Sequence, residues 1–460
     1  VLAQGLTGTL WQRRIARSHL PPGPTPLPFL GNVLQLKAEG MVNSLREVGL
    51  LFSNGERWRQ LRRFSLAALQ DFGTGQRSVE EQIQDEAQRL VEEFRKTKGL
   101  PFDPTFFLSR SASSVICAIV FGQRFDYADE SFLDLLLLKL PHFNSFPYPT
   151  LQLYEMFSWI MRFLPGAHKQ IFQDLEDINS FILERIKANQ ASLDRDNPRD
   201  FIDCFLLQME KEILNPTTEF HLRNLVLTAF NLFFVGTETS HDGESWCLQP
   251  GHVLCPACLP LEKMTQEIDR VIGRSRMPAV EDRSRMPYTD AVIHEIQRFS
   301  DVIPMNLPHA LTQDTHFRGY TIPKGTEVFP VLSSVLWDPS RFRDPERFDP
   351  TRFLDEQGQF KANEAFMPFS TGKRSCVGQE LARMELFVFL TAILQNFTLK
   401  CPVPPQDLDL RLRGAGFAHV PPCYQLCAVP RGEGSRAQEE RPKDRLQGTA
   451  GAAKGPNPAT

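Results

Sequence analysis

Hydrophobic residues recur at helical spacing in several stretches of the chain. Residues 76–95 place their apolar positions on one stripe, which predicts an amphipathic helix. Residues 220–240 keep the same period and carry so many apolar side chains that this helix should cross the interior. Residues 115–121 form a further buried segment, and residues 381–397 predict an almost wholly apolar helix. The pattern therefore predicts a helical core assembled from distant parts of the chain.

The helix predicted at 220–240 meets a barrier soon after its end. Pro250, Pro256 and Pro260 follow, and a proline inside a helix removes a hydrogen-bond donor and clashes with the preceding turn. We expect the helix to stop just past Ser240. The segment 241–260 also contains Cys247, His252, Cys255 and Cys258, and the last two have zinc-ligand spacing. Because its composition is that of unselected sequence, we do not favour a zinc site.

Composition excludes some classes of protein. With 460 residues and 42% hydrophobic content, the chain can bury a large core. A net charge of -4 gives no global attraction to nucleic acid, and no nucleic-acid partner is expected. The nine cysteines lack the spacing of a disulfide framework, so we expect a reducing compartment. No run of 18 apolar residues predicts a membrane-spanning helix.

A loop at residues 369–378, with the sequence FSTGKRSCVG, presents one cysteine directly before the last apolar helix. Gly372 and Gly378 let the backbone approach both a sulfur ligand and a macrocycle closely. Arg374 is placed to pair with an anionic group through its planar guanidinium. We interpret Cys376 as the axial thiolate of a haem. The alternative is that Cys376 is a small buried hydrophobic residue, which is the commonest fate of a free cysteine.

The pattern F-x-x-G-x-R-x-C-x-G in this loop resembles the signature of the cytochromes P450, and the chain is similar to the microsomal family-2 members. The resemblance implies a mainly α fold with small β-sheets. It implies haem (iron protoporphyrin IX), with iron bound by Cys376 and Phe369 packed on the proximal side. Arg374 would pair with a haem propionate, as would Trp58 and Arg62, which match the family's W-x-x-x-R.

Further family motifs lie elsewhere in the chain. His309 matches another propionate partner, while Glu295, Arg298 and Arg352 match a buried ion network on the haem side. In the segment VGTETS that begins at Val235, Gly236 would let the helix backbone approach a ligand where the helix opens locally over the haem. Thr239 would donate a hydrogen bond to bound dioxygen and Glu238 would relay protons. Helix capping is the alternative role of this segment.

The resemblance also implies an apolar pocket for small lipophilic substrates. The positions that would line it also suit an ordinary core. They are Asn231, Phe234, Val235, Ile303, Asn306, Leu307 and Phe417.

Four features depart from the family. Residues 1–36 resemble the basic stretch and the proline-rich hinge that follow the membrane anchor in microsomal relatives, but the apolar anchor segment itself is not evident. A junction at 37–51 stands where relatives carry a sheet and helices. The segment 241–260 is foreign to the family, and residues 431–460 are expected to form a disordered tail. The unit 37–430 is thus an incomplete P450 haem domain with a truncated central helix.

Two functions remain open. The chain is either a defective P450 relative, which we favour because local and global signals disagree, or an active monooxygenase that takes electrons from NADPH-cytochrome P450 reductase. Arg59, Arg62 and Arg63 resemble the surface that receives this reductase, although a solvated helix face is the alternative. The resemblance places the chain on the cytosolic face of the endoplasmic reticulum membrane. The aromatic segment 143–172 would contact the membrane surface or belong to the core.

Overall fold

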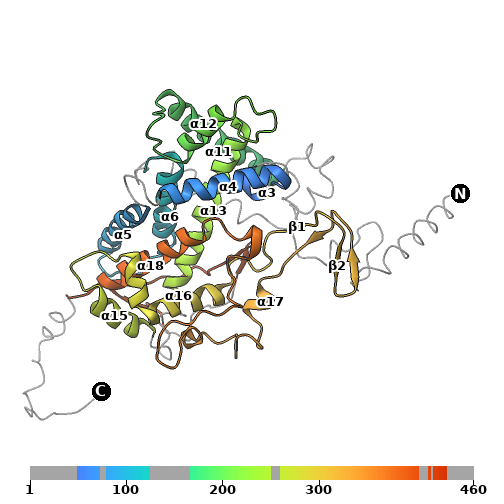
Figure 1. Ribbon diagram of the computed structural model, residues 1–460. Helices are drawn as coiled ribbons and strands as arrows, with labels where there is room; N and C mark the ends of the chain where they lie inside the picture. Colours follow the sequence, from blue (N-terminus) through green and yellow to red (C-terminus); the bar gives the residue numbers. More distant parts are fainter. Residues whose placement is uncertain are drawn as a thin grey trace, which may run out of the picture.

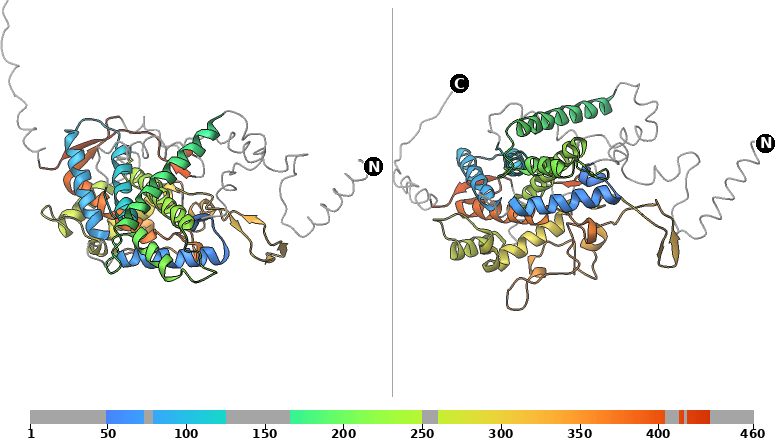
Figure 2. Two further views of the ribbon diagram at one scale, coloured as in Figure 1. Left: turned by 90° about the horizontal axis from the view of Figure 1, so that it is seen from above. Right: turned by 45° about the horizontal axis from the view of Figure 1, so that its top comes forward.

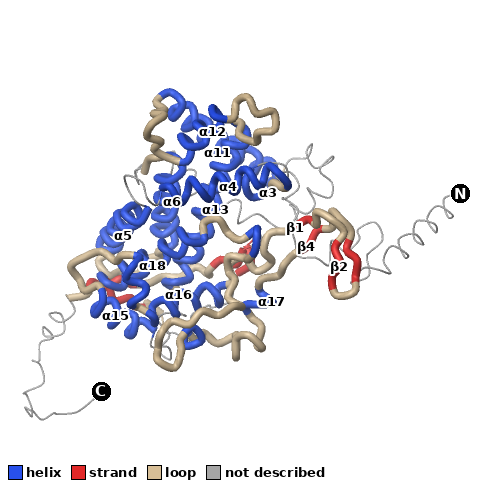
Figure 3. The backbone as a smooth tube through the Cα atoms, viewed as in Figure 1, coloured by secondary structure: helices blue, strands red, loops and turns tan. Residues whose placement is uncertain are grey.

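The computed structural model describes residues 49–72, 79–124, 166–249, 260–403, 413–415 and 418–432. Helices make up most of this part of the chain, and short strands lie at its margins (Figure 3). The expected mainly α fold with small β-sheets is confirmed. The hinge, most of the junction, the aromatic segment up to residue 165, Phe417 and the tail after residue 432 lie outside the described residues. The same holds for His252, Cys255 and Cys258 of the zinc alternative.

The helices pack around one long central helix, α13 (Figures 1 and 2). The central helix α13 spans Leu222–Leu248. The helices that precede it in the chain are α3 (Gly49–Phe52), α4 (Gly55–Phe72), α5 (Val79–Lys96), α6 (Thr105–Phe121), α11 (Ala167–Ala191) and α12 (Phe201–Lys211). The helices that follow it are α15 (Pro260–Val271), α16 (Pro287–Ser300), α17 (Ser333–Leu336) and α18 (Gln379–Asn396).

The described strands form antiparallel pairs. They are β1 (His309–Ala310) with β4 (Glu327–Val328), β2 (Thr315–Phe317) with β3 (Tyr320–Ile322), β5 (Phe397–Lys400) with β8 (Cys427–Pro430), and β6 (Arg413–Ala415) with β7 (Ala418–Val420). The β5–β8 register places Leu399 opposite Ala428. Both side chains are buried, so this pair closes one edge of the core around α18.

Two large apolar clusters divide the core along α13. One gathers α5, α15, α16 and α18 around the carboxyl end of α13, and Leu386 to Leu390 of α18 are all buried in it. The other joins α4, α6, α11 and α12 to the amino-terminal half of α13. The stripe predicted for residues 76–95 is confirmed, because Ile83, Ala87, Leu90 and Phe94 are all buried.

The predicted end of the central helix is wrong. Helix α13 continues past Ser240 to Leu248, with Gln249 as its C-cap, and so stops just before Pro250. Trp246, Cys247 and Leu248 are buried in the core. A proline ends a helix only near its own position, so nothing in residues 241–248 prevented the additional turns.

Gly122 ends α6 in the left-handed conformation, with φ +65°. A Cβ there would lie 2.5 Å from Oδ2 of Asp200, the N-cap of α12. We predict that Gly122→Ala lowers the free energy of unfolding by more than the about 1–2 kcal/mol that left-handed backbone alone costs an alanine. Gly358, with φ +74° and open space around it, is the matched control. Urea unfolding of both alanine variants should show the larger loss at Gly122, and equal losses would contradict the steric account.

Candidate functional site

The cysteine loop is closed by its own backbone. Cys376 N–H donates to Phe369 O at 3.0 Å, and Ser375 N–H donates to Gly372 O at 3.1 Å. Gly372 has φ +71°, which a glycine adopts without steric cost. Gly378 N–H donates to the Cys376 sulfur and lowers the pKa of the thiol. The loop therefore fixes the position of the sulfur and supplies a donor that favours the thiolate.

The Cys376 side chain is exposed, although protein surrounds it. Desolvation is the largest influence and raises the pKa of the thiol, while the Gly378 N–H and the charge of Arg62 oppose it. The exposed sulfur is open to a ligand, and the influence of the Arg62 charge places α4 near it.

Basic and aromatic side chains gather next to this thiol. The Arg374 guanidinium lies 4.0 Å from the centre of the Trp58 ring, and that of Arg62 lies 5.8 Å from it. Arg62 also donates to Ser375 Oγ at 3.3 Å. Burial and then the charge of Arg374 lower the pKa of His309, which places this histidine at the same cluster. Residues separated by more than 300 positions in the chain thus meet at one site.

The positive charges of this cluster are not balanced by the described part of the chain. Desolvation, followed by repulsion from Arg62, lowers the pKa of Arg374. Among the ion pairs of the described residues, none links a carboxylate to Arg62 or Arg374. Arg374 instead donates to Ser53 O and Asn54 Oδ1, both at 2.9 Å. The site therefore suits an anionic ligand.

Helix α13 places Glu238 and Thr239 in half-buried positions. The Thr239 hydroxyl donates to Val235 O at 2.7 Å, and the helix runs through this point without a break, so the expected local opening is absent. A Cβ on Gly236 would lie 2.5 Å from Ile116 Cδ1. The glycine therefore allows close packing against α6, rather than the expected approach to a ligand.

Three of the residues predicted to line the substrate pocket contact other side chains or backbone of the chain. Asn231 Oδ1 accepts from Leu51 N–H at 3.0 Å, while the Phe234 ring stacks on Phe230 with centroids 5.8 Å apart. Asn306 donates through Nδ2 to Ser370 Oγ at 2.9 Å and so braces the cysteine loop. The remaining described candidates, Val235, Ile303 and Leu307, are half-buried.

Glu295, Arg298 and Arg352 meet in a buried ion network. Arg298 donates to both carboxylate oxygens of Glu295, at 2.7 and 2.9 Å, and both side chains are fully buried. Arg352 Nε lies 3.4 Å from a carboxylate oxygen of Glu295, and Arg352 also donates to the backbone carbonyls of Asp344 and Arg347. Asp349 N–H adds a hydrogen bond to Glu295 at 2.8 Å. The network ties α16 to the segment that leads into the cysteine loop.

Comparison with known proteins decides the family. The model described as "Cytochrome P450" matches residues 46–428. The chain belongs to the cytochrome P450 family. It is 49% identical to cytochrome P450 2G1 of Oryctolagus cuniculus, over 92% of this chain and 95% of that protein. It is 48% identical to cytochrome P450 2A5 of Mus musculus and to cytochrome P450 2A13 of Homo sapiens, each over 92% of this chain and 96% of the relative. The predicted relation to microsomal family-2 members is confirmed.

The residues present fit the haem that P450 proteins bind through a cysteine thiolate. A soft sulfur ligand is exposed in the loop, near two guanidinium groups without a carboxylate partner among the described residues, a tryptophan and a histidine. Thiolate suits iron and guanidinium suits a carboxylate, so this donor set matches the iron and the propionates of one haem. Across the described residues, no other group of histidine, cysteine and acidic side chains could hold a metal.

Two features of the P450 site were missed in the sequence. Ser53 and Asn54 hold Arg374, and Asn306, with φ +56°, braces Ser370 in the loop. No motif at Ser53 or Asn54 indicated their contact with Arg374. An asparagine tolerates left-handed backbone better than most residues, so Asn306 offered a weak signal of its turn.

None of the described helices combines the length and apolar content that crossing a bilayer requires.

Proposed function

We propose that this chain is a haem-thiolate monooxygenase relative that keeps the haem-binding residues around Cys376 but is severely impaired both in haem loading and in turnover. The observation that carries the family function is the meeting of Cys376 with Arg62, Arg374, Trp58 and His309. These residues come from different parts of the chain, and their common chemistry is the binding of an anionic, thiolate-ligated cofactor.

Each residue has a role in this proposal. Cys376, which accepts a hydrogen bond from the Gly378 N–H, would supply the thiolate that binds the iron, and Phe369 would pack beside it. Arg62, Arg374, Trp58 and His309 would bind the propionates. When bound, haem would supply dioxygen activation and the insertion of one oxygen atom into a lipophilic substrate. Thr239 and Glu238 would hold and deliver protons.

Substrate would lie against the α13 residues Asn231, Phe234 and Val235 and against Ile303, Asn306, Leu307 and Phe417. Small lipophilic molecules suit this mostly apolar set. Electrons would come from NADPH-cytochrome P450 reductase, and Arg59 and Arg63 are exposed on α4 where an acidic partner could dock. By likeness to its microsomal relatives, the protein would work at the cytosolic face of the endoplasmic reticulum membrane.

Missing segments support the impairment. The alignment with the rabbit protein runs over 475 positions, whereas 92% of this 460-residue chain is about 423 residues, so about 50 aligned positions have no residue here. The family match begins at residue 46, within the 37–51 junction. Relatives carry a sheet and helices there, and their loss would expose strand edges and core surface.

The carboxyl end of α13 supports the impairment independently. Both carboxylate oxygens of Glu244 are buried without a hydrogen-bond partner. A buried polar group without a hydrogen-bond partner is costly in either protonation state, because nothing replaces its lost hydration. The helix that bears this cost also carries Thr239, and small misplacements of reacting groups reduce rates by about 10²-fold.

The competing candidate is an active monooxygenase with the same residues in the same roles. The assembled cluster at Cys376 favours it, because the haem-binding groups are close together despite the departures. Turnover of a small lipophilic ether with the reductase separates the two candidates. We expect a rate per haem at least about 10²-fold below that of cytochrome P450 2G1 assayed in parallel. Comparable rates would establish the active enzyme.

A further inference from the structure

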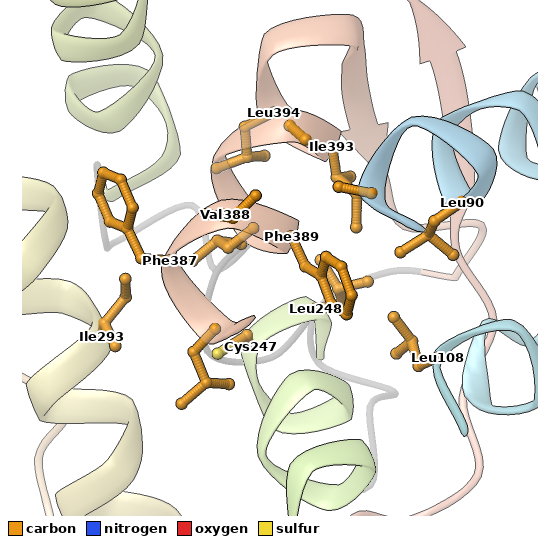
Figure 4. Packing of buried hydrophobic residues seen from close by; sticks show 14 of the residues in the cluster. Leu90, Leu108, Cys247, Leu248, Ile293, Phe387, Val388, Phe389, Ile393 and Leu394 are labelled. Atoms are coloured by element: carbon orange, nitrogen blue, oxygen red, sulfur yellow. The ribbon is translucent and has the colours of Figure 1, made fainter. Parts of the chain in front are cut away.

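Acidic side chains are buried where α13 packs against α18. Glu244 is 3% exposed and Asp242 is 4% exposed, both on α13, and Glu385 of α18 is fully buried. Their surroundings are apolar: Figure 4 shows Cys247 and Leu248 at the end of α13, beside Leu108 of α6 and Phe389 of α18. None of these acids belongs to the haem-binding cluster.

Hydrogen bonding satisfies only one of the four carboxyl oxygens of Glu244 and Glu385. Glu385 Oε2 accepts from Ser240 Oγ at 2.7 Å, but Glu385 Oε1 and both oxygens of Glu244 have no partner. The cavity beside Glu244 has a volume of ≈10 Å³, which is at or below the space that one water needs. Solvent therefore cannot replace the missing partners.

Among the described residues, no basic side chain lines this cavity. It is lined by Leu108 of α6, by Glu244, Cys247 and Leu248 of α13, and by Leu386, Phe389, Leu390 and Ile393 of α18. The charged neighbour of Glu244 is Glu385, which carries the same sign. Asp242 faces Glu238, again a like charge.

This arrangement favours the protonated acids. Burial raises the pKa of Glu385 to about 8, against the smaller effect of the Ser240 hydroxyl. Burial, and then repulsion from Glu385, raises the pKa of Glu244 well above its ordinary value. Burial and Glu238 likewise raise the pKa of Asp242. Cys247 contributes no charge, because burial keeps its thiol protonated by raising its pKa.

We propose that Glu244 and Glu385 form a protonation-dependent lock between α13 and α18, which holds the helices together when both acids are neutral and separates them when both ionise. Helix α13 carries Thr239, and α18 begins three residues after Cys376. Opening the lock would therefore move both sides of the proposed haem site relative to each other.

The lock is a property of the folded chain without haem, so it stands or falls separately from the proposed function. Because the folded pKa values are raised, the folded state retains protons that the unfolded state has released. Stability is then greatest below the unfolded pKa and is lost as pH rises toward about 8 for Glu385. Each retained proton makes the unfolding constant rise by up to about tenfold per pH unit.

The test is urea unfolding of the full chain, followed by circular dichroism, between about pH 5 and pH 8. Other groups titrate in this window, so the comparison of variants is decisive. We expect Glu244→Gln to reduce the rise of the unfolding constant with pH by up to about tenfold per unit and to stabilise the protein at the upper end. Glu385→Gln should act in the same direction, although it also alters the Ser240 hydrogen bond.

Glu262→Gln is the matched control, because Glu262 is exposed on α15. Its unfolding constant should follow the pH dependence of the unaltered chain. Since Glu244→Gln removes a buried ionisable group that must otherwise stay protonated, it is expected to fold at least as well as that chain at the upper end of the pH range. A pH dependence that Glu244→Gln leaves unchanged would overturn the lock, whatever haem content the protein shows.

Discussion

Cys376→Ser is expected to abolish the thiolate-type Soret band of the reduced, carbon monoxide-treated protein. A serine hydroxyl stays protonated near neutral pH and cannot supply the soft anionic sulfur that iron binds in this family. The Gly378 N–H and the basic side chains would remain, so haem could still associate through its propionates. The loss should therefore affect the ligand signature more than haem retention, and spectra normalised to haem content measure it.

Cys423→Ser is the control for this substitution, because Cys423 is also exposed but lies far along the chain from the loop. The variant should keep whatever thiolate band the unaltered chain shows. An unchanged band in Cys376→Ser, or an equal loss in Cys423→Ser, would refute the assignment of Cys376 as the ligand.

Glu295→Ala should lower the free energy of unfolding by about 3–5 kcal/mol, the typical cost of breaking a buried ion pair. The alanine would leave the Arg298 guanidinium fully buried without its carboxylate, and would remove an acceptor from Asp349 N–H and from Arg352. Carbonyl groups of Leu336 and Pro345 would still accept from Arg298, which keeps the loss finite.

Urea unfolding measures this loss, with Glu356→Ala as the control. Glu356 is an exposed glutamate in the segment that follows the network. Exposed substitutions of this kind usually change stability by less than about 0.5 kcal/mol. If both variants lost the same stability, the network would have no special role in holding α16 to the segment around Asp349 and Arg352.

Local motifs made much of the site predictable. The spacing of Glu295 and Arg298 places them one helical turn apart, so their pairing could be expected from sequence. Trp58 and Arg62 likewise lie one turn apart on α4. Glycines around Cys376 predicted a tight loop, and the hydrogen bonds of that loop are present. In each case the information lies within a few residues.

Contacts between distant segments were not predictable in this way. Asn231 was predicted to line the substrate pocket, and nothing in the sequence around it indicated that its side-chain oxygen accepts from the backbone N–H of Leu51, 180 residues away. The close approach at Gly236 depends on Ile116 of another helix. The extension of α13 to Leu248 depends on buried packing of Trp246 against the core, which outweighs the polar composition of residues 241–245. Tertiary contacts decided these features, and periodicity does not encode them.

Glu244 shows how a sequence pattern can conceal an energetic problem. As a residue, glutamate is a good helix former, so its presence does not argue against the helix. Only the packing of α18 against α13 reveals that both of its carboxylate oxygens lack partners. One of the two supports for the proposed impairment is thus a feature that appears only once the helices are placed together.

The most direct test of the central claim is the spectrum of the purified full chain, reduced under carbon monoxide and normalised to protein concentration. The account predicts haem well below one per chain, with a thiolate-type Soret band only in that fraction. Cytochrome P450 2G1, prepared in the same way, provides the reference for full loading. Stoichiometric haem with a full thiolate-type band would contradict the proposed impairment and favour an active monooxygenase.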